Sequence, residues 1–235
     1  ELSKLASNAM LAQRISSITS LSFLCEKTGA NINEVSKAIG MDHRIGNKFL
    51  NPSPGFGGSC FQKDILNLVY LFKYYGLDEV AEYWHQVVKL NNRQRIRIVN
   101  KIENFVSENK LDKKVIILGW AFKKDTNDSR ESSSIYVSLE LLKKGFELFI
   151  YDPKIKKSRI ISDIIQLNNL NNKDKIKTIN KIKVFDDLKS AVILEYPLVI
   201  LTEWDEFKTL NNSNKKLKIF DFRNIIDRDK TIFSL

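Results

Sequence analysis

The sequence is poor in cysteine, proline, glycine and histidine. Its 235 residues contain 2 Cys, 4 Pro, 9 Gly and 2 His. Two cysteines cannot build a disulfide framework, which indicates a reducing, cytoplasmic setting. With 43% hydrophobic residues and so few chain breakers, the composition is typical of an ordinary soluble globular protein. The length allows one large or two small domains, each with a real core.

Long apolar runs are also missing. No run approaches the roughly 20 residues of a membrane-spanning helix, so we expect no membrane partner. No basic-then-apolar leader opens the chain. The first residues, ELSKLASNAM, are already in helical periodicity. We therefore interpret Glu1 as a cut within a longer protein.

Acidic residues are fewer than basic ones. The chain has 28 Asp and Glu against 38 Lys and Arg, which gives a net charge of +10. A basic chain can bind nucleic acid, anionic lipid or a phosphorylated small molecule. Much of the excess lies in Lys/Asn/Ile-rich stretches such as residues 168–183, with no interleaved aromatics, zinc spacing or nucleic-acid motif. We expect a solvated surface, no nucleic-acid partner and no metal. Binding of anionic nucleotide substrates is the secondary explanation.

The most informative stretch is residues 51–70, NPSPGFGGSCFQKDILNLVY, in which a Pro- and Gly-rich loop runs into an amphipathic helix. Cys60 falls at the helix N-terminus, where unpaired N–H groups, the dipole and nearby Lys63 favour a thiolate. Asp64, four residues on, would share its face and could orient water or move a proton. Cys60 is thus a candidate nucleophile, and a buried structural cysteine is the alternative. Cys25, in an apolar helical segment, favours a packing role.

The remaining pattern predicts two regions. Residues 1–110 read as an all-α region that ends in one long helix, about 78–108, which suggests a connector between domains. In residues 111–235, strands are expected in KKVIILGWAF, FELFIYDP, YPLVILTEW and KLKIFDFR, with helical segments between them. This alternation predicts an α/β, Rossmann-like parallel sheet with right-handed crossovers.

Ligands of such sheets gather at the carboxyl ends of the strands. Four candidate side chains fall there: Phe122, Lys123, Arg130 and Arg223. Lysine and arginine suit phosphate, because arginine offers a planar fork and lysine a point charge. Structural ion pairs with Asp125, Asp128 or Glu131 are the alternative for the basic residues.

Several motifs resemble the UDP-glucose/GDP-mannose dehydrogenase family, in particular its animal-type members. GFGGSCFQKD resembles the catalytic cysteine signature, and the likeness continues through ELSKLASNAMLAQRISSI, GMDHRIGNKFL, LGWAFKKDTNDSRESSS and YDPK. It covers nearly the whole chain and is weak only at about 155–190. The resemblance implies a central dimerisation domain and a C-terminal UDP-sugar domain. It also implies an N-terminal NAD-binding domain that this chain lacks, since no G-x-G-x-x-G follows a strand here.

The activity implied by the resemblance is oxidation of UDP-glucose to UDP-glucuronate by NAD, through a thiohemiacetal and a thioester on Cys60. Lys4 would stabilise the developing oxyanion, Asn8 would hold sugar or water, and Asp64 would assist hydrolysis. We expect this chain alone to be inactive. Family members form homodimers through the middle domain and often assemble further, possibly to hexamers.

The resemblance also implies ligand contacts. Substrate contacts are expected from Arg44, Phe49, Phe56, Gly57, Phe122, Lys123 and Arg223, and cofactor contacts from Arg130 and Lys63. The arginine that matches Arg44 reaches into a neighbouring subunit's site, and without the resemblance Phe49 and Phe56 would be core anchors of the loop. Phe222 replaces a glycine of the family pattern, and we expect this bulky residue to alter the backbone next to Arg223.

Two other functions stay open at this point. One is a dehydrogenase for GDP-mannose or a UDP-N-acetyl sugar, which competition among nucleotides would separate. The other is a non-catalytic nucleotide-sugar-binding or dimerisation module, for which an unreactive Cys60 would argue.

Overall fold

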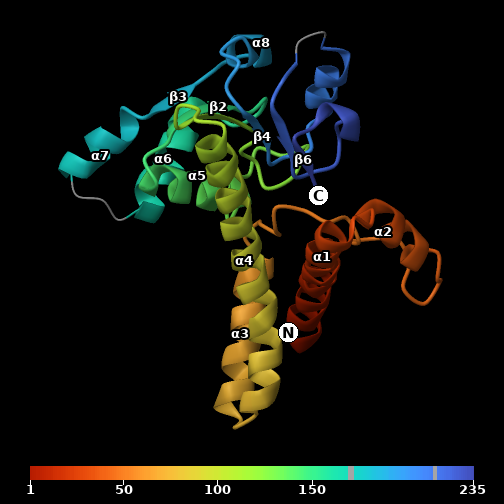
Figure 1. Ribbon diagram of the computed structural model, residues 1–235. Coiled ribbons are helices and arrows are strands. Elements are labelled where there is room, and N and C mark those ends of the chain that lie inside the picture. Colours follow the sequence, from red (N-terminus) through yellow and green to blue (C-terminus); the bar gives the residue numbers. More distant parts are fainter. Residues whose placement is uncertain (169–171, 214–215) are drawn as a thin grey trace. The chain divides into compact units, whose positions relative to one another are not determined.

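A computed structural model describes residues 1–168, 172–213 and 216–235 (Figure 1). The Lys/Asn-rich stretch at 168–183 therefore lies partly outside the described residues. The chain forms two compact units, residues 1–95 with Leu235 and residues 96–234. The fold class is the predicted one, a helical region followed by an α/β Rossmann-like domain. In the described parts of the chain, no helix combines the length and apolar character that crossing a bilayer requires.

The helical region has four helices: α1 (Leu2–Thr28), α2 (Ile32–Gly40), α3 (Phe61–Tyr74) and α4 (Asp78–Glu108). Gly29 ends α1 in the left-handed conformation, with φ 75°, which glycine adopts without a Cβ penalty. Asn31 caps α2 by accepting a hydrogen bond from the N–H of Asn33. The α4 helix spans both compact units, which divide between Arg95 and Ile96.

Small residues let α1 pack closely against α3. Ala9 and Ala12 are fully buried, in one cluster with Ile65 and Leu68 of α3. Cys25 is buried in a separate cluster with Ile18, Ile32 and Leu50, as its apolar surroundings predicted. This packing fixes the faces of α1 and α3 on which Asn8 and Asp64 stand.

The second unit contains a six-stranded sheet in the order β3-β2-β1-β4-β5-β6, with every neighbouring pair parallel. Its strands are β1 (Lys114–Leu118), β2 (Glu147–Tyr151), β3 (Ile182–Val184), β4 (Leu198–Ile200), β5 (Ile219–Asp221) and β6 (Phe233–Ser234). The sequence predicted only four of them. It missed β3 and β6 because these edge strands are two or three residues long and only partly buried, so they carry no clear apolar pattern.

Helices connect these strands: α5 (Ser133–Lys143), α6 (Lys157–Asn168), α7 (Asn172–Ile179) and α8 (Leu188–Val192), with 3₁₀ turns η1 (Asp205–Asn212) and η2 (Arg228–Lys230). The α5 and α6 helices contact one another, and both lie between β1 and β3 in sequence (Figure 1). Winding reverses between β1 and β4, which are neighbours although β2 and β3 separate them in sequence. That reversal is the switch point at which doubly wound sheets bind ligands.

Candidate functional site

Cys60 stands at the N-cap of α3, as the sequence predicted, and its side chain is exposed. No side chain caps this helix end, so the N–H groups and dipole of its first turn remain directed toward the sulfur region. The hydroxyl of Ser59 lies 3.7 Å from the Cys60 Sγ. Cys60 is therefore not the buried structural cysteine that was its alternative, and its thiol is accessible to a reagent or substrate.

Asp64 and Asn8, 56 residues apart in sequence, form one polar pair. The Asn8 Nδ2 donates to the Asp64 Oδ2 at 2.6 Å, and the Asp64 side chain is buried. The backbone N–H of Asp64 donates to the carbonyl of Cys60 at 2.9 Å, which fixes the turn between them. Lys4 lies one helical turn before Asn8 and is exposed. This arrangement places a carboxylate, an amide and an exposed thiol on adjoining turns of α1 and α3.

Buried polar residues of α4 hold the loop that precedes Cys60. Asn91 accepts from the Phe56 N–H at 2.8 Å and donates to the Phe56 carbonyl at 3.1 Å. Arg95 donates to the same carbonyl at 3.2 Å, and Gln94 donates to the Ser53 carbonyl at 3.1 Å. No sequence motif points to these residues. The available signal is their spacing on α4, because polar residues three and four apart on an otherwise apolar face indicate buried polar contacts.

Aromatic rings surround the start of α3. The Phe61 ring lies edge-on to Phe56, with centroids 6.0 Å apart, and 6.4 Å from Phe49. Phe56 is a core anchor of the loop, as predicted without the resemblance. Phe49 is not, because it is 41% exposed. Its positive φ of 62° belongs to a turn before the loop. Gly57 is partly exposed next to Phe56.

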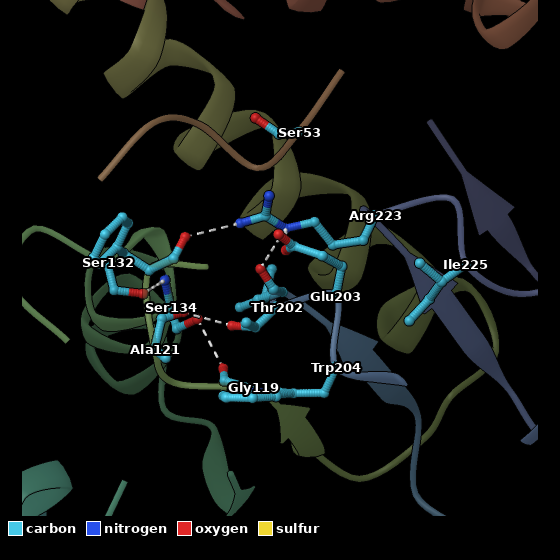
Figure 2. Close-up of polar contacts among 12 residues, drawn as sticks. Ser53, Gly119, Ala121, Ser132, Ser134, Thr202, Glu203, Trp204, Arg223 and Ile225 are labelled. Carbon is cyan, nitrogen blue, oxygen red and sulfur yellow. Dashed lines mark hydrogen bonds and ion pairs between the residues drawn. The ribbon is translucent and has the colours of Figure 1, made fainter. Parts of the chain in front are cut away.

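Arg223 is the central side chain at the carboxyl ends of the strands. Its Nε donates to the Leu201 carbonyl at 2.8 Å and lies 3.2 Å from a Glu203 carboxylate oxygen, while an Nη donates to the Phe122 carbonyl at 3.3 Å. Figure 2 shows the guanidinium turned toward Glu203. Burial lowers the pKa of Arg223, and the negative charges of Glu203 and Asp221 oppose that effect. The guanidinium thus joins the ends of β1, β4 and β5 at the switch point.

Phe222 lies in the core beside Arg223. It is 1% exposed, and its ring packs 6.5 Å from Phe220 and 5.3 Å from Phe233. The bulky residue at the family glycine position is therefore accommodated on the apolar side of the sheet. Asp221 fixes the following turn by accepting N–H bonds from Arg223, at 2.8 Å, and from the next residues of the turn. Burial raises the pKa of Asp221 despite these hydrogen bonds.

Asp152 ties the loops after β1, β2 and β4 together. One carboxylate oxygen accepts the N–H groups of Trp120 and Ala121 and the indole N–H of Trp204, at 2.6 to 3.0 Å. The other accepts two N–H groups of the turn that follows β2. In the sequence, Asp152 belongs to the YDPK motif, which predicted no function for it. Its contacts make the carboxyl edge of the sheet a rigid frame for Arg223.

Two predicted ligand-binding arginines pair with an aspartate two residues earlier. Arg44 binds Asp42 through Nε at 3.0 Å and Nη at 2.7 Å, and Arg130 binds Asp128 in the same manner, at 3.0 and 2.8 Å. In both cases the arginine lowers the pKa of the aspartate. The structural ion pair weighed for Arg130 is thus present, although both guanidinium groups remain largely exposed at the surface.

Two predicted lysines make few contacts. Lys123 is exposed, and its Nζ lies 5.6 Å from the centroid of the Phe122 ring. Lys63 is exposed on the first turn of α3.

A dinucleotide site requires a glycine-rich connection between a strand and a helix, and a metal site requires several ligands close together. Gly119, after β1, is the only glycine in that strand-to-helix connection, and a Cβ there would lie 2.4 Å from the Cβ of Thr202. This glycine permits close packing on Thr202, and the connection lacks the later glycines of the dinucleotide-binding fingerprint. In residues 1–168, 172–213 and 216–235, no group of three or more His, Cys, Asp or Glu is arranged to hold a metal ion.

Comparison with known proteins gives consistent matches along the chain. The UDP-glucose/GDP-mannose dehydrogenase family, central domain, matches residues 1–93, and the UDP binding domain of the same family matches residues 116–228. The UDP-glucose 6-dehydrogenase of Gallus gallus is 52% identical over 235 residues, which are 97% of this chain and 47% of the relative. UDP-glucose 6-dehydrogenase 1 of Glycine max is 50% identical over 243 residues, with 98% and 50% covered.

A solved structure of a UDP-glucose dehydrogenase from Pyrobaculum islandicum has a TM-score of 0.79 and 24% sequence identity. The match covers 99% of this chain and 49% of that chain, and at this identity it shows the fold alone. The chain spans about half the length of the curated relatives it matches. From the family matches and the identity along nearly all of its length, the chain belongs to the UDP-glucose/GDP-mannose dehydrogenase family and contains the regions of its central and UDP-binding domains.

Proposed function

We propose that this chain is the central and C-terminal part of a UDP-glucose 6-dehydrogenase that converts UDP-glucose to UDP-glucuronate. The observation that carries the proposal is the exposed Cys60 at the start of α3, with the Asn8–Asp64 pair on adjoining turns. A thiol, a carboxylate and an amide in this order suit covalent capture of an aldehyde followed by hydrolysis. The proposed localisation is the cytoplasm, where Cys60 would stay reduced.

In the proposed mechanism, oxidation at C6 of the sugar first gives an aldehyde, to which the Cys60 thiolate adds as a thiohemiacetal. A second oxidation gives a thioester, and water then attacks the acyl carbon so that the thiolate leaves and glucuronate forms. Asp64 would orient or deprotonate that water, while Lys4 and Asn8 would stabilise the oxyanions. Each oxidation requires a hydride acceptor, which is the role of NAD in the family resemblance.

We propose that the two domains, residues 1–110 and residues 111–235, have different functions. The first would carry the chemistry and contact the sugar through Phe49, Phe56 and Gly57, with Arg44 reaching a second subunit. The second would bind UDP through Phe122, Lys123 and Arg223. Arg130 and Lys63 would approach NAD bound outside this chain. Because no G-x-G-x-x-G follows a strand in this sequence, we expect the chain alone not to turn over.

Changing Arg223 to lysine is expected to weaken UDP-glucose binding to the full-length protein by about tenfold to a hundredfold, because lysine offers one point charge where arginine offers a fork. Isothermal titration calorimetry measures this affinity. Arg93→Lys is the matched control, since Arg93 is an exposed arginine of α4 and does not belong to the loops that follow the strands. Equal affinities of the two variants for UDP-glucose would contradict the proposal that Arg223 binds UDP. Competition with GDP-mannose and a UDP-N-acetyl sugar tests the choice of nucleotide.

We also propose that the helical region forms the homodimer contact. Exposed aromatic side chains contact one another at the end of α3: Tyr70, Tyr74 and Tyr75. Solvent-exposed apolar surface of this kind is typical of interaction sites. Light scattering is expected to give about twice the chain mass of 27.2 kDa. Tyr74→Glu should shift the protein toward the monomer, whereas a monomeric wild type would contradict the proposal.

A further inference from the structure

The loop before Cys60 has few hydrogen bonds of its own, such as that from the Gly55 N–H to the Ser53 Oγ. Residues 51–59 lie in no helix or strand, so no regular ladder of backbone hydrogen bonds fixes them. Pro52 and Pro54 lack an N–H, which removes two donors from the loop. Gly55 has a positive φ of 131°, a conformation that is open to glycine. The path of this loop therefore depends on groups that bind it from outside.

Three side chains of α4 supply those groups. Asn91 pairs with both the N–H and the carbonyl of Phe56, and Arg95 adds a second bond to that carbonyl. Gln94 binds the carbonyl of Ser53. Asn91, Gln94 and Arg95 are 3%, 0% and 3% exposed, so these hydrogen bonds are shielded from solvent. A buried polar group that lost its partner there would lower the free energy of unfolding.

The contacts determine where α3 begins. Phe56 lies four residues before Cys60, and only two glycines and a serine intervene. The Phe56 ring also packs against Phe61, the first residue of α3. Fixing the backbone of Phe56 from α4 therefore fixes the approach of the chain to the N-cap.

We propose that Asn91, Gln94 and Arg95 are positioning residues for the Cys60 nucleophile, an inference that rests on the proposed function. They hold the loop backbone so that the thiol stays at the α3 N-terminus and in line with the substrate. A nucleophile misplaced by about 1 Å can cost on the order of a hundredfold in rate, even when substrate binding is unchanged. The loss should therefore fall on kcat and on thiol reactivity and leave KM nearly unchanged.

The test uses the full-length protein with two variants, Asn91→Ala and Gln94→Leu. Val88→Ala is the control, because it removes buried methyl groups from the same helix and leaves the side chains of Asn91, Gln94 and Arg95 in place. For each protein we would measure kcat and KM for UDP-glucose. The rate of Cys60 alkylation by iodoacetamide, followed by peptide mass spectrometry from pH 6 to 9, provides a readout that a general loss of stability does not change in folded protein.

Asn91→Ala is expected to lower kcat and the alkylation rate at neutral pH by about tenfold or more, with KM changed by less than about threefold. Gln94→Leu should show the same pattern more weakly, and Val88→Ala should keep wild-type values below its unfolding temperature. Wild-type kcat and alkylation in both loop variants would overturn the proposal. A wild-type protein that does not oxidise UDP-glucose would instead refute the proposed function, while the alkylation rates would still test the positioning of Cys60.

Discussion

Changing Cys60 to serine in the full-length protein is expected to stop the oxidation after the aldehyde stage and to lower glucuronate formation on the order of a thousandfold. The serine hydroxyl is not ionised near neutral pH, so the helix N-terminus that favours a thiolate cannot generate an equivalent nucleophile. Without the covalent adduct, no thioester forms. The products can be followed by mass spectrometry, with a carbonyl reagent to trap the aldehyde.

Cys25→Ser is the matched control for that experiment. Cys25 is the other cysteine of the chain and is buried among apolar side chains of α1 and α2, away from the α3 N-terminus. It should retain turnover while losing some stability, since a hydroxyl replaces a well-packed thiol. Full conversion to glucuronate by Cys60→Ser would exclude the covalent scheme.

The second large effect concerns folding. Gly119→Ala is expected to destabilise this chain by about 3–5 kcal/mol. Gly119 has a φ of 94°, and its new Cβ would lie 2.4 Å from the Cβ and 2.5 Å from the Oγ1 of Thr202. Thr202 cannot move aside easily, because it is fully buried and its Oγ1 donates to the Ala121 carbonyl at 2.6 Å. Figure 2 shows Gly119 and Thr202 at the same end of the sheet.

Gly76→Ala separates the two causes of that loss. Gly76 has a similar positive φ of 71°, but no atom lies within 4 Å of its added Cβ. Only backbone strain should remain, at about 1 kcal/mol. Urea unfolding followed by circular dichroism measures both variants. Equal losses would show that contact with Thr202 contributes nothing at the switch point.

Local signals in the sequence predicted most of the helical region. Gly29 and Asn31 mark the boundary between α1 and α2, and α4 has the predicted length because its periodicity is uninterrupted. The parallel sheet followed from the alternation of strands and helices. The edge strands β3 and β6 were missed because short, half-exposed strands are defined by pairing with a neighbour and carry little pattern of their own.

The motifs also led to the family, which the comparisons confirm. The contacts around the site were less accessible. The Asn8–Asp64 pair joins helices that are far apart in sequence. The hydrogen bond between Asn91 and Phe56 depends on how α4 packs against the loop. The pairing of Arg44 with Asp42 likewise depends on a local turn, in which the Arg44 N–H and Nε both donate to the Asp42 carboxylate. Such contacts depend on tertiary packing and on backbone turns that residue types alone do not specify.

The most direct measurement is the number of NADH molecules formed per UDP-glucose by the full-length protein, with this chain assayed beside it. The account predicts two NADH for each UDP-glucuronate from the full-length protein and none from the chain alone, because both oxidations require a dinucleotide site and no G-x-G-x-x-G follows a strand in this sequence. A folded full-length protein that forms no NADH from UDP-glucose would contradict the account, and so would turnover by this chain alone.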